Sequence, residues 1–329
     1  MTSSSKKILV VGGAGYIGSH TCKALAEAGM QPVVVDDLSA GHDWAVKWGP
    51  LQRCDIRDGE ALDAIFAAHR PDAVLHFAAK INVGESVTAP EIYYGNNVGG
   101  TLTLLDVMRR HDCRKLVFSS SCAVYGTPQR MPLDESHPYG PINPYGASKL
   151  MAETMIADFG RAHGLAHVAL RYFNAAGAEA DAGIGEDHQP ETHLIPLLLD
   201  AVQGRQGAIT VFGDDYPTPD GTCVRDYIHV ADLAAAHLKA LDYLGQGGAS
   251  TAFNLGNGAG YSVREVIDAV QRVTGKEVPT REGARRDGDA PELISQSSAA
   301  TEALGWTPER PAIETQIEDA WRWHQAHFG

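Results

Sequence analysis

The chain has 329 residues, of which 44% are hydrophobic and 21% are charged, so it can form one large domain or two ordinary domains with a substantial core. It has 27 basic and 41 acidic residues, a formal net charge of −14, and no dense run of Lys and Arg, so a nucleic-acid partner is not expected. The five cysteines are scattered without a Cys-x-x-Cys pair, which argues against a disulfide framework or a cysteine zinc site, favours a reducing cytoplasm and leads us to expect no metal.

The first half of the chain has the pattern of repeated β-α-β units. Residues 1–7 are polar and lead into a short apolar stretch that is broken at Gly12, so neither a signal peptide nor a membrane span is expected. Short β-branched stretches then alternate with amphipathic ones, which predicts a parallel sheet covered by helices. The expected strands are residues 8–11, 32–36, 51–55, 73–77, 115–119 and 167–173. The expected helices include residues 61–68, 100–110 and 143–162.

The composition changes near the middle of the chain. Residues 177–188 are rich in Gly, Ala, Asp and Glu without a hydrophobic period, which indicates a connector. We therefore expect an α/β protein with a doubly wound parallel-sheet Rossmann domain in residues 1–177 and a smaller mixed α/β domain in residues 178–329. Segments after residue 222 can return to pack on the first domain. The later helices are expected at residues 194–202, 263–274 and 313–327, and the later strands near residues 209–212, 224–229 and 252–255.

A glycine-rich turn follows the first expected strand. Residues 12–18 read GGAGYIG, which fits both the G-x-x-G-x-x-G and the G-x-G-x-x-G spacing. Glycine allows a tight turn and a close approach to a pyrophosphate, and the next helix offers free N–H groups and the positive end of its dipole. Asp36 ends the second strand, where a carboxylate can bind both ribose hydroxyls and would repel a 2′-phosphate, so NAD is preferred to NADP. The alternative is a turn that only packs the helix on the strand.

Further candidates for the nucleotide site lie at the ends of later strands. The residues expected around the adenine and ribose are Asp55, Ile56, Phe77, Ala78 and Ala79. Asp55 can equally be a helix N-cap. Asn96 and Asn97 are either turn residues or amide donors beside the cofactor.

The next expected helix carries the candidate catalytic pair. Asn143 can cap this helix and Pro144 can occupy its first position, which puts Tyr145 and Lys149 on one face, four residues apart. Ser121 ends the fifth strand at the edge where open α/β sheets bind ligands. An ammonium and a positive nicotinamide ring favour the phenolate, and lowering its pKa of about 10 by ~3 units needs ~4 kcal/mol. Tyr145 is thus a candidate base and Ser121 a candidate proton relay; the alternative is a core tyrosine, a solvated lysine and a strand-end hydroxyl.

Nearly the whole chain resembles the extended short-chain dehydrogenase/reductase family, and within it the group that epimerises UDP-sugars at C4. The resemblance rests on SSS-x-x-VYG at residues 119–126 and on GGAGYIGSHT, VGESV, PYGASKLM, RYFNAAGA, GEDH, VFGDDYPTPDGTCVRDYIHV, FNLGNG and ARRDGD. It implies a homodimer that interconverts UDP-glucose and UDP-galactose through a 4-keto intermediate, with tightly bound NAD.

Together, the motifs and the resemblance imply three sets of site residues. The catalytic residues would be Tyr145 as the base, Lys149 and Ser121. The NAD site would consist of Gly12, Gly15, Tyr16, Ile17, Gly18, Asp36, Asp55, Ile56, Phe77, Ala78, Ala79, Asn96, Tyr145, Lys149 and Tyr172. The UDP-sugar site would consist of Ser121, Asn174, Leu194, Phe212, Arg225, Tyr227, Arg286, Asp289 and Leu293.

The two arginines of this set would balance the phosphate charges of the substrate. A UDP-sugar brings two phosphate charges to an acidic protein, so local cations must overcome an unfavourable field. Arg225 and Arg286 suit this task because guanidinium groups bind phosphate in a two-pronged geometry. The alternative is that they make weak surface ion pairs with Asp226 or Asp289.

Three positions depart from the best-known members of the family. Lys80 stands one place earlier than in some relatives, which puts a phosphate contact in doubt, and His193 replaces a common asparagine. Leu293 stands on the sugar-facing wall where some relatives carry tyrosine. The smaller leucine leaves room for an N-acetyl group, so activity on UDP-N-acetylglucosamine and UDP-N-acetylgalactosamine is a further expectation.

Proteins of this fold also catalyse other reactions on nucleotide sugars. Dehydratases commonly place an Asp-Glu pair after the strand-end serine or threonine, whereas this chain has Cys122 and Ala123, which cannot support elimination at neutral pH. Decarboxylases of the same fold are also rivals, and an epimerase for UDP-glucuronate or a pentose derivative stays open. An inactive dinucleotide sensor would lack the tyrosine or the lysine, and both are present.

Overall fold

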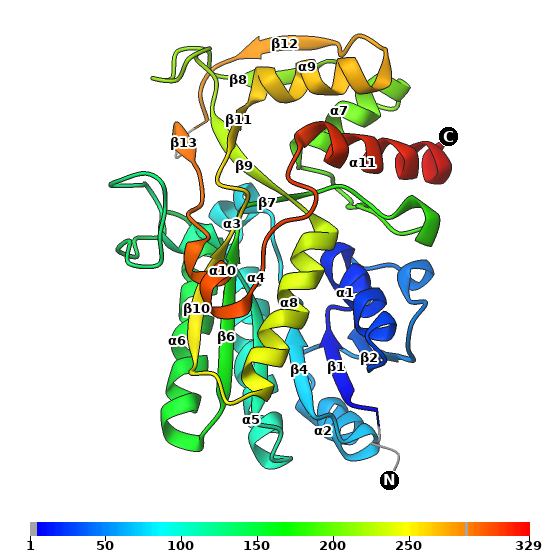
Figure 1. Cartoon of the computed structure of the whole chain (residues 1–329), viewed down its shortest axis with the longest axis vertical. Coiled ribbons are helices and arrows are strands. Elements are labelled where there is room, and N and C mark those ends of the chain that lie inside the picture. The colour runs from blue at the N-terminus through cyan, green and yellow to red at the C-terminus, as the bar shows by residue number, and fades with distance from the viewer. Residues whose placement is uncertain (1–4, 287–288) are drawn as a thin grey trace.

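The protein has a large lower part and a smaller upper part (Figure 1). The computed structural model describes residues 5–286 and 289–329; Met1–Ser4 and the Asp287–Gly288 pair of the ARRDGD motif lie outside the described residues. The lower part contains a seven-stranded parallel sheet in the order β10-β6-β5-β4-β1-β2-β3. Its strands are β1 (Lys7–Val11), β2 (Gln31–Asp36), β3 (Leu51–Arg53), β4 (Ala73–His76), β5 (Lys115–Ser121), β6 (Ala166–Tyr172) and β10 (Thr251–Leu255).

Helices cover both faces of this sheet. Residues of α1, α8 and α10 form one core layer with the strands, and residues of α2, α5 and α6 form the other. Because both faces are covered, β1 is buried from Ile8 to Val11 and has a continuous apolar sequence rather than an alternating one. The bounds of these helices are α1 (Tyr16–Glu27), α2 (Gly59–His69), α5 (Gly100–Arg110), α6 (Pro144–His163), α8 (Val230–Gly245) and α10 (Ser298–Leu304).

The upper part has its own apolar core between three helices and two small sheets. One sheet has the order β11-β9-β13 with β7 paired to β9, and the other pairs β12 with β8. The elements are β7 (Asn174–Ala176), α7 (Leu194–Gln203), β8 (Ile209–Phe212), β9 (Val224–His229), β11 (Gly260–Ser262), α9 (Val263–Thr274), β12 (Thr280–Gly283), β13 (Glu292–Leu293) and α11 (Ile313–Phe328). Short turns of helix complete the chain: η1 (Asp43–Ala45), α3 (Val83–Thr88), α4 (Pro90–Tyr93), η2 (Tyr94–Gly99), η3 (Cys122–Val124) and η4 (Ala180–Ala182).

The predicted α/β class with a doubly wound parallel sheet is confirmed, and every predicted strand and helix is present within a few residues. Helix α8 was not singled out because it begins at Val230, directly after β9, with no turn residues to separate them. Strand β10 joins the edge of the large sheet beside β6. The division of the chain at residue 178 stays a prediction. None of the described helices is both long and apolar enough to cross a bilayer.

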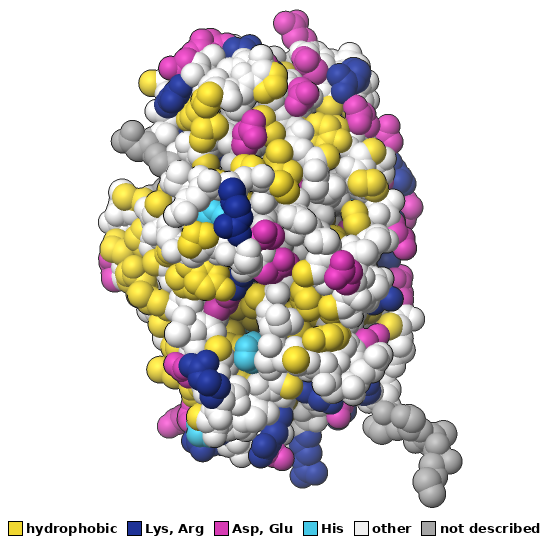
Figure 2. Space-filling model, turned by 60° about the vertical axis from the view of Figure 1, so that its left-hand side comes forward, with side chains coloured by type: hydrophobic (Ala, Val, Ile, Leu, Met, Phe, Trp, Pro, Cys, Tyr) yellow, Lys and Arg dark blue, Asp and Glu magenta, His cyan; other side chains and the backbone are white. Residues whose placement is uncertain are grey.

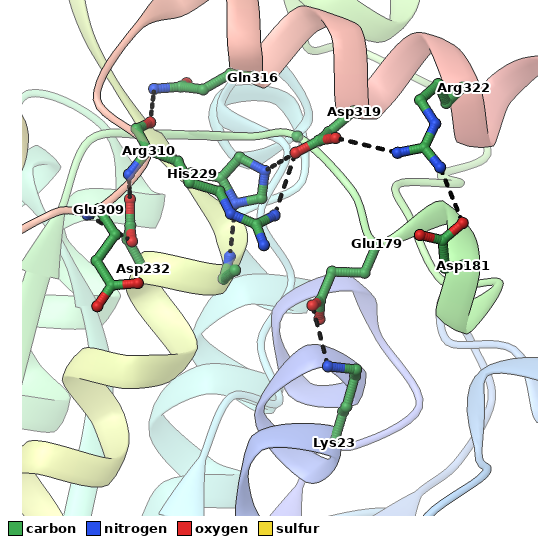
Figure 3. Close-up of polar contacts among 12 residues, drawn as sticks. Lys23, Glu179, Asp181, His229, Asp232, Glu309, Arg310, Gln316, Asp319 and Arg322 are labelled. Atoms are coloured by element: carbon green, nitrogen blue, oxygen red, sulfur yellow. Dashed lines mark hydrogen bonds and ion pairs between the residues drawn. The ribbon is translucent and has the colours of Figure 1, made fainter. Parts of the chain in front are cut away.

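Polar contacts connect the upper and lower parts (Figure 3). Lys23 on α1 pairs with Glu179 of the connector at 3.1 Å, and Arg322 on α11 pairs with Asp181 at 2.9 Å. The two carboxylate oxygens of Asp232, on α8, accept the backbone N–H groups of residues 309 and 310 at 2.9 and 3.0 Å. The Asp232 contacts hold the segment before α11 against α8. The two ion pairs connect the segment around η4 to α1 and to α11.

Buried histidines make this core sensitive to acid, and His237 on α8 is the clearest case. Its ring lies 4.6 Å from the Phe77 ring, and burial lowers its pKa to about 4. The unfolded chain takes up the proton near pH 6.5, so the stability that neutral His237 provides above that pH is lost as the pH falls toward 4. When the pH is lowered from 7 to 5, the unfolding free energy of the wild type should therefore fall by about 2 kcal/mol more than that of His237→Leu.

Urea unfolding at the two pH values measures this difference. His163→Leu is the matched control, because His163 is exposed at the end of α6, and it should follow the wild type. Equal acid losses in the wild type and His237→Leu would contradict the prediction.

Candidate active site

The order of the large sheet creates a crevice at the carboxyl ends of its central strands. The chain runs from β1 toward β3 on one side and from β4 toward β10 on the other, so its direction reverses between β1 and β4. Ligands of open α/β sheets bind at such a reversal. The glycine-rich turn leaves β1 at this point and enters α1.

The glycines of the turn have different roles. Gly12 has φ +84°, and a Cβ there would lie 2.5 Å from the backbone nitrogen of Ala78. A Cβ on Gly18 would overlap the carbonyl oxygen of Gly12, so both positions allow α1 to pack closely against the sheet. Gly15 differs, because a Cβ there would meet only the Gly12 carbonyl, at 3.5 Å. Packing alone therefore does not require the glycine at position 15.

The surroundings of Gly15 fit a dinucleotide. Gly15 caps α1 without a side-chain hydrogen bond, and the first helical turn has no acidic residue, which leaves the positive end of the helix dipole for an anion. Asp36 lies nearby at the end of β2, where its carboxylate accepts the N–H groups of Ala14 at 3.0 Å and Leu38 at 2.9 Å. Burial raises the pKa of Asp36.

Asp55 is not a helix cap. The cap of α2 is Asp58, whose side chain accepts the Ala61 N–H at 3.0 Å. Asp55 instead pairs with Arg57 at 2.6 Å, and this arginine lowers the pKa of Asp55. The carboxylate thus stays ionised at the carboxyl end of β3, and the N-cap alternative for this residue is wrong.

The segment after β4 is held by the paired asparagines. The Asn97 side chain accepts the Lys80 N–H at 2.8 Å and donates to the Lys80 carbonyl at 3.1 Å and to Ser148 on α6 at 3.0 Å. Asn96 donates to Asn97 at 3.0 Å. The Lys80 ammonium reaches Ser39 instead, at 3.2 Å. Asn97 therefore ties the loop that follows β4 to the helix of the candidate catalytic pair.

Helix α6 presents that pair as predicted from its start signals. Asn143 caps the helix by accepting the Gly146 N–H at 2.8 Å, and Pro144 is its first residue. Lys149 is buried and donates to the Ser119 carbonyl at 2.8 Å, with its ammonium 5.0 Å from the centre of the Phe118 ring. The cap thus places Tyr145 and Lys149 against the carboxyl end of β5.

Burial dominates the electrostatics of the pair in the ligand-free protein. Burial raises the pKa of Tyr145 to about 12, and the neighbouring Ser121 hydroxyl only partly opposes this rise. Burial also lowers the pKa of Lys149 to about 7. In the ligand-free protein, burial therefore outweighs the neighbouring groups at both residues. The lowering of the phenol pKa expected from the ammonium together with the nicotinamide ring stays a prediction. A further positive charge is needed to stabilise the phenolate.

A buried ion pair beneath the catalytic helix was not predicted from the sequence. Glu153, four residues after Lys149, pairs with Arg171 of β6 at 2.5 Å and accepts a hydrogen bond from Ser120. Arg171 also donates to the Tyr125 hydroxyl at 2.9 Å. Because Glu153 raises the pKa of Lys149 against the effect of burial, this pair helps to keep the lysine charged. Its only sequence signal was the i,i+4 spacing on α6.

Several candidate substrate residues gather around Asp289. Its carboxylate pairs with Arg286 at 2.9 Å and with Arg225 at 3.5 Å, so the surface ion pair considered above is present for both arginines. The Arg286 guanidinium also lies 5.0 Å from the centre of the Phe212 ring. An aromatic ring and two guanidinium groups thus stand together at the edge of the upper part.

The remaining candidates lie on β7, β9, β13 and α7. Tyr227 on β9 is buried, and its strand pairs with β7 so that it faces Asn174 in the register. Leu293 on β13 pairs with Arg225 and packs with a small cluster that contains Tyr125 and Phe173. Leu194 begins α7. Tyr227 and Leu194 thus pack with the apolar core of the upper part.

Comparisons with known proteins agree with this arrangement. Residues 8–256 match the NAD dependent epimerase/dehydratase family. A UDP-glucose 4-epimerase of Rhizobium meliloti (strain 1021) is 53% identical over 320 residues, which are 97% of each chain. The crystal structure of UDP-glucose 4-epimerase from Brucella ovis in complex with NAD has 51% identity and a TM-score of 0.94, covering 96% of this chain and 98% of that one. The enzyme from Bifidobacterium longum, in complex with NAD+ and UDP, has 38% identity and a TM-score of 0.93, covering 98% and 99%.

The burial of Lys149 leads to a prediction about stability. In the ligand-free protein, Lys149→Met should raise the unfolding free energy by about 2–4 kcal/mol at pH 6, because no ammonium is then desolvated. The pKa of Lys149 is about 7 in the folded protein and 10.5 for a free lysine. The destabilisation by the lysine is therefore full below pH 7 and fades as the pH rises toward 10.5.

Urea unfolding at pH 6 and pH 9 tests this sign. Lys239→Met, at an exposed position on α8, serves as the control and should have little effect at either pH. A Lys149→Met effect that is the same at both values would refute the prediction.

Proposed function

Because the chain belongs to the NAD dependent epimerase/dehydratase family, we propose that it is an isomerase that interconverts UDP-glucose and UDP-galactose by inverting C4 of the sugar. The proposal is carried by the position of Tyr145, Lys149 and Ser121 at the carboxyl edge of the parallel sheet, the edge from which the glycine-rich turn also leaves β1. Similarity to UDP-glucose 4-epimerases over nearly the full length supports it.

NAD is the cofactor, as in the similar Brucella ovis and Bifidobacterium longum structures. Gly15 and the start of α1 would hold its diphosphate, and Asp36 would hold the adenosine ribose. When bound, NAD supplies a hydride acceptor and then returns the hydride. The further residues proposed for this site are Gly12, Tyr16, Ile17, Gly18, Asp55, Ile56, Phe77, Ala78, Ala79, Asn96, Tyr145, Lys149 and Tyr172.

The chain's own residues move the proton. The Tyr145 oxygen takes the proton of the C4 hydroxyl as C4 becomes a ketone, and it returns that proton when C4 is reduced on the other face. Ser121 holds the hydroxyl and passes the proton. Lys149 is held in place by its hydrogen bond to the Ser119 carbonyl. In its protonated form, the lysine stabilises the Tyr145 phenolate.

The upper part would hold the UDP group at a distance from the reacting carbon. Arg225 and Arg286 suit the diphosphate, and they gather around Asp289. Phe212, Tyr227, Asn174, Leu194 and Leu293 complete the proposed site. Binding the substrate through its nucleotide leaves the sugar free to turn, which inversion at C4 requires.

Elimination chemistry is not supported at this site. Cys122 follows Ser121 where an acid would be needed, and burial raises the pKa of its thiol to about 12. Ala123 has no proton to give. Neither residue can protonate a leaving hydroxyl at neutral pH.

A homodimer in the cytoplasm is part of the proposal. Exposed apolar side chains on α3, α4, α5 and α6 support the dimer. They are Val83, Val87, Ile92, Leu102 and Met151, and exposed Ile81 lies just before α3. Apolar side chains also gather along one edge of the view in Figure 2, and such surfaces commonly bind another protein. Free thiols at all five cysteines are in keeping with a reducing compartment.

The proposed activity has a direct test. The purified protein, incubated with UDP-galactose and no added cofactor, should form UDP-glucose. Tyr145→Phe should lower kcat by about 10²–10⁴-fold, the usual contribution of a general base, and it should keep its bound NAD. Tyr243→Phe, on α8 away from the site, is the control. The assignment fails if no product forms in either direction with NAD supplied.

The cofactor site predicts a specific effect at Gly15. Gly15→Ala should lose most of its bound NAD, because the added Cβ fills the space proposed for the diphosphate. Since this Cβ clashes with no protein atom, the thermal stability of the NAD-free variant should stay close to that of the NAD-free wild type. Gly207→Ala, which has open space around it, should keep its NAD. Absorbance of the released nucleotide measures the content. Normal NAD content in Gly15→Ala would mean that the turn serves packing alone.

The leucine at position 293 predicts tolerance of a larger sugar. Leu293→Tyr should reduce turnover of UDP-N-acetylglucosamine much more than turnover of UDP-glucose, because the larger side chain removes the space for the N-acetyl group. Leu293→Met keeps a similar volume and should spare both activities. Equal losses on the two sugars in Leu293→Tyr would rule out this explanation.

A further inference from the structure

The connector between η4 and α7 brings together four side chains that the proposed reaction does not use. They are Glu186, His188, Glu191 and His193, and one possible ligand atom from each lies within 4.8 Å of the other three. The expectation of no metal rested on the cysteine pattern and did not consider this Glu-x-His-x-x-Glu-x-His spacing.

We propose that these four side chains bind one zinc ion. Bonds of about 2.0–2.1 Å to nitrogen and oxygen in a tetrahedral site put neighbouring ligand atoms about 3.4 Å apart. The His188 Nδ1 atom lies 3.3 Å from Glu186 and 3.5 Å from Glu191, and the His193 Nδ1 atom lies 2.9 Å from both. Small adjustments of side chains in a loop would therefore complete the tetrahedron.

The charges of the cluster favour a cation at its centre. Within residues 5–286 and 289–329, Glu186 and Glu191 form ion pairs only with the two histidines. Glu186 is buried, so two carboxylates share a site without a Lys or Arg. With neutral imidazoles the four ligands carry two negative charges, which match a divalent ion, and two nitrogens with two oxygens suit zinc.

The alternative is that protonated histidines, rather than a metal ion, balance the charges of the two carboxylates. The carboxylates raise the pKa of His188 to about 9 in opposition to its burial. However, the buried Nδ1 atom of His188 contacts Glu186 at 3.3 Å and Glu191 at 3.5 Å without hydrogen-bond geometry, whereas a buried protonated ring requires a hydrogen-bond partner. A metal bond would satisfy this nitrogen.

The position of the cluster indicates a structural role. Four protein ligands leave no open coordination position, as in structural zinc sites. The His188 ring meets the Tyr16 ring edge-on at 6.5 Å, and His193 directly precedes Leu194 at the start of α7. A zinc ion here would therefore fasten the connector between the proposed cofactor and substrate sites without touching the reacting carbon.

Metal content of the full-length protein tests the proposal. The protein is stripped with a chelator, reloaded with Zn²⁺, desalted and analysed by elemental mass spectrometry, and its affinity is measured by competition with a chromophoric chelator. The wild type should retain one equivalent. His188→Gln and His193→Gln should each bind zinc more than about 100-fold more weakly, because loss of a partner that merely orients a metal ligand already costs 10–100-fold.

The control is His163→Gln, which removes an exposed histidine on α6 and should retain one equivalent. Gel filtration and NAD content show whether each variant is folded, so a misfolded variant cannot be mistaken for a lost site. Wild-type protein loaded with Co²⁺ gives a second readout, in which a tetrahedral site absorbs strongly in the visible range. Zinc retention that is equal in the ligand variants and the control, weak Co²⁺ absorption, or no retention by the wild type would overturn the proposal.

Discussion

The removal of Lys149 and Tyr145 from water is the constraint on which the proposed site depends. Helix α6 brings both side chains against the end of β5, where burial moves the pKa of the lysine to about 7 and that of the tyrosine to about 12. Each shift opposes the charged form that proton transfer needs. In the proposed reaction, the positive nicotinamide ring of bound NAD would supply the further charge that stabilises the phenolate.

Contacts elsewhere in the fold hold Lys149 and Tyr145 in place despite the unfavourable free energy of burying their charged forms. The cap at Asn143 sets the start of α6, the Ser119 carbonyl fixes the ammonium, and the ion pair of Glu153 with Arg171 lies one turn further along the helix. The parallel sheet then places the glycine-rich turn at the same edge. In the proposed complex, the arginines of the upper part would hold the nucleotide, and the residues of α6 and β5 would hold the reacting sugar.

Local signals in the sequence predicted much of this arrangement. The glycine-rich turn and the Asn-Pro helix start each specify a backbone conformation within a few residues, and both were confirmed. Asp55 could not be told from a helix cap, because Asp58 stands three residues later and competes for the same role. The pKa shifts of Tyr145 and Lys149 in the ligand-free protein could not be predicted from the sequence, because they depend on burial by distant segments. The Glu186 to His193 cluster was missed because its spacing acquires meaning only when the connector folds back on itself.

The central claim is that the protein's own groups leave Tyr145 a weak acid and that bound NAD changes this. The most direct measurement is an ultraviolet difference titration of the Tyr145 phenol, with Tyr145→Phe as the reference, on protein with and without NAD. The account predicts a pKa near 12 without NAD and a clearly lower value with oxidised NAD bound. A phenol pKa already near neutral without NAD, or one that does not change when NAD binds, would contradict it.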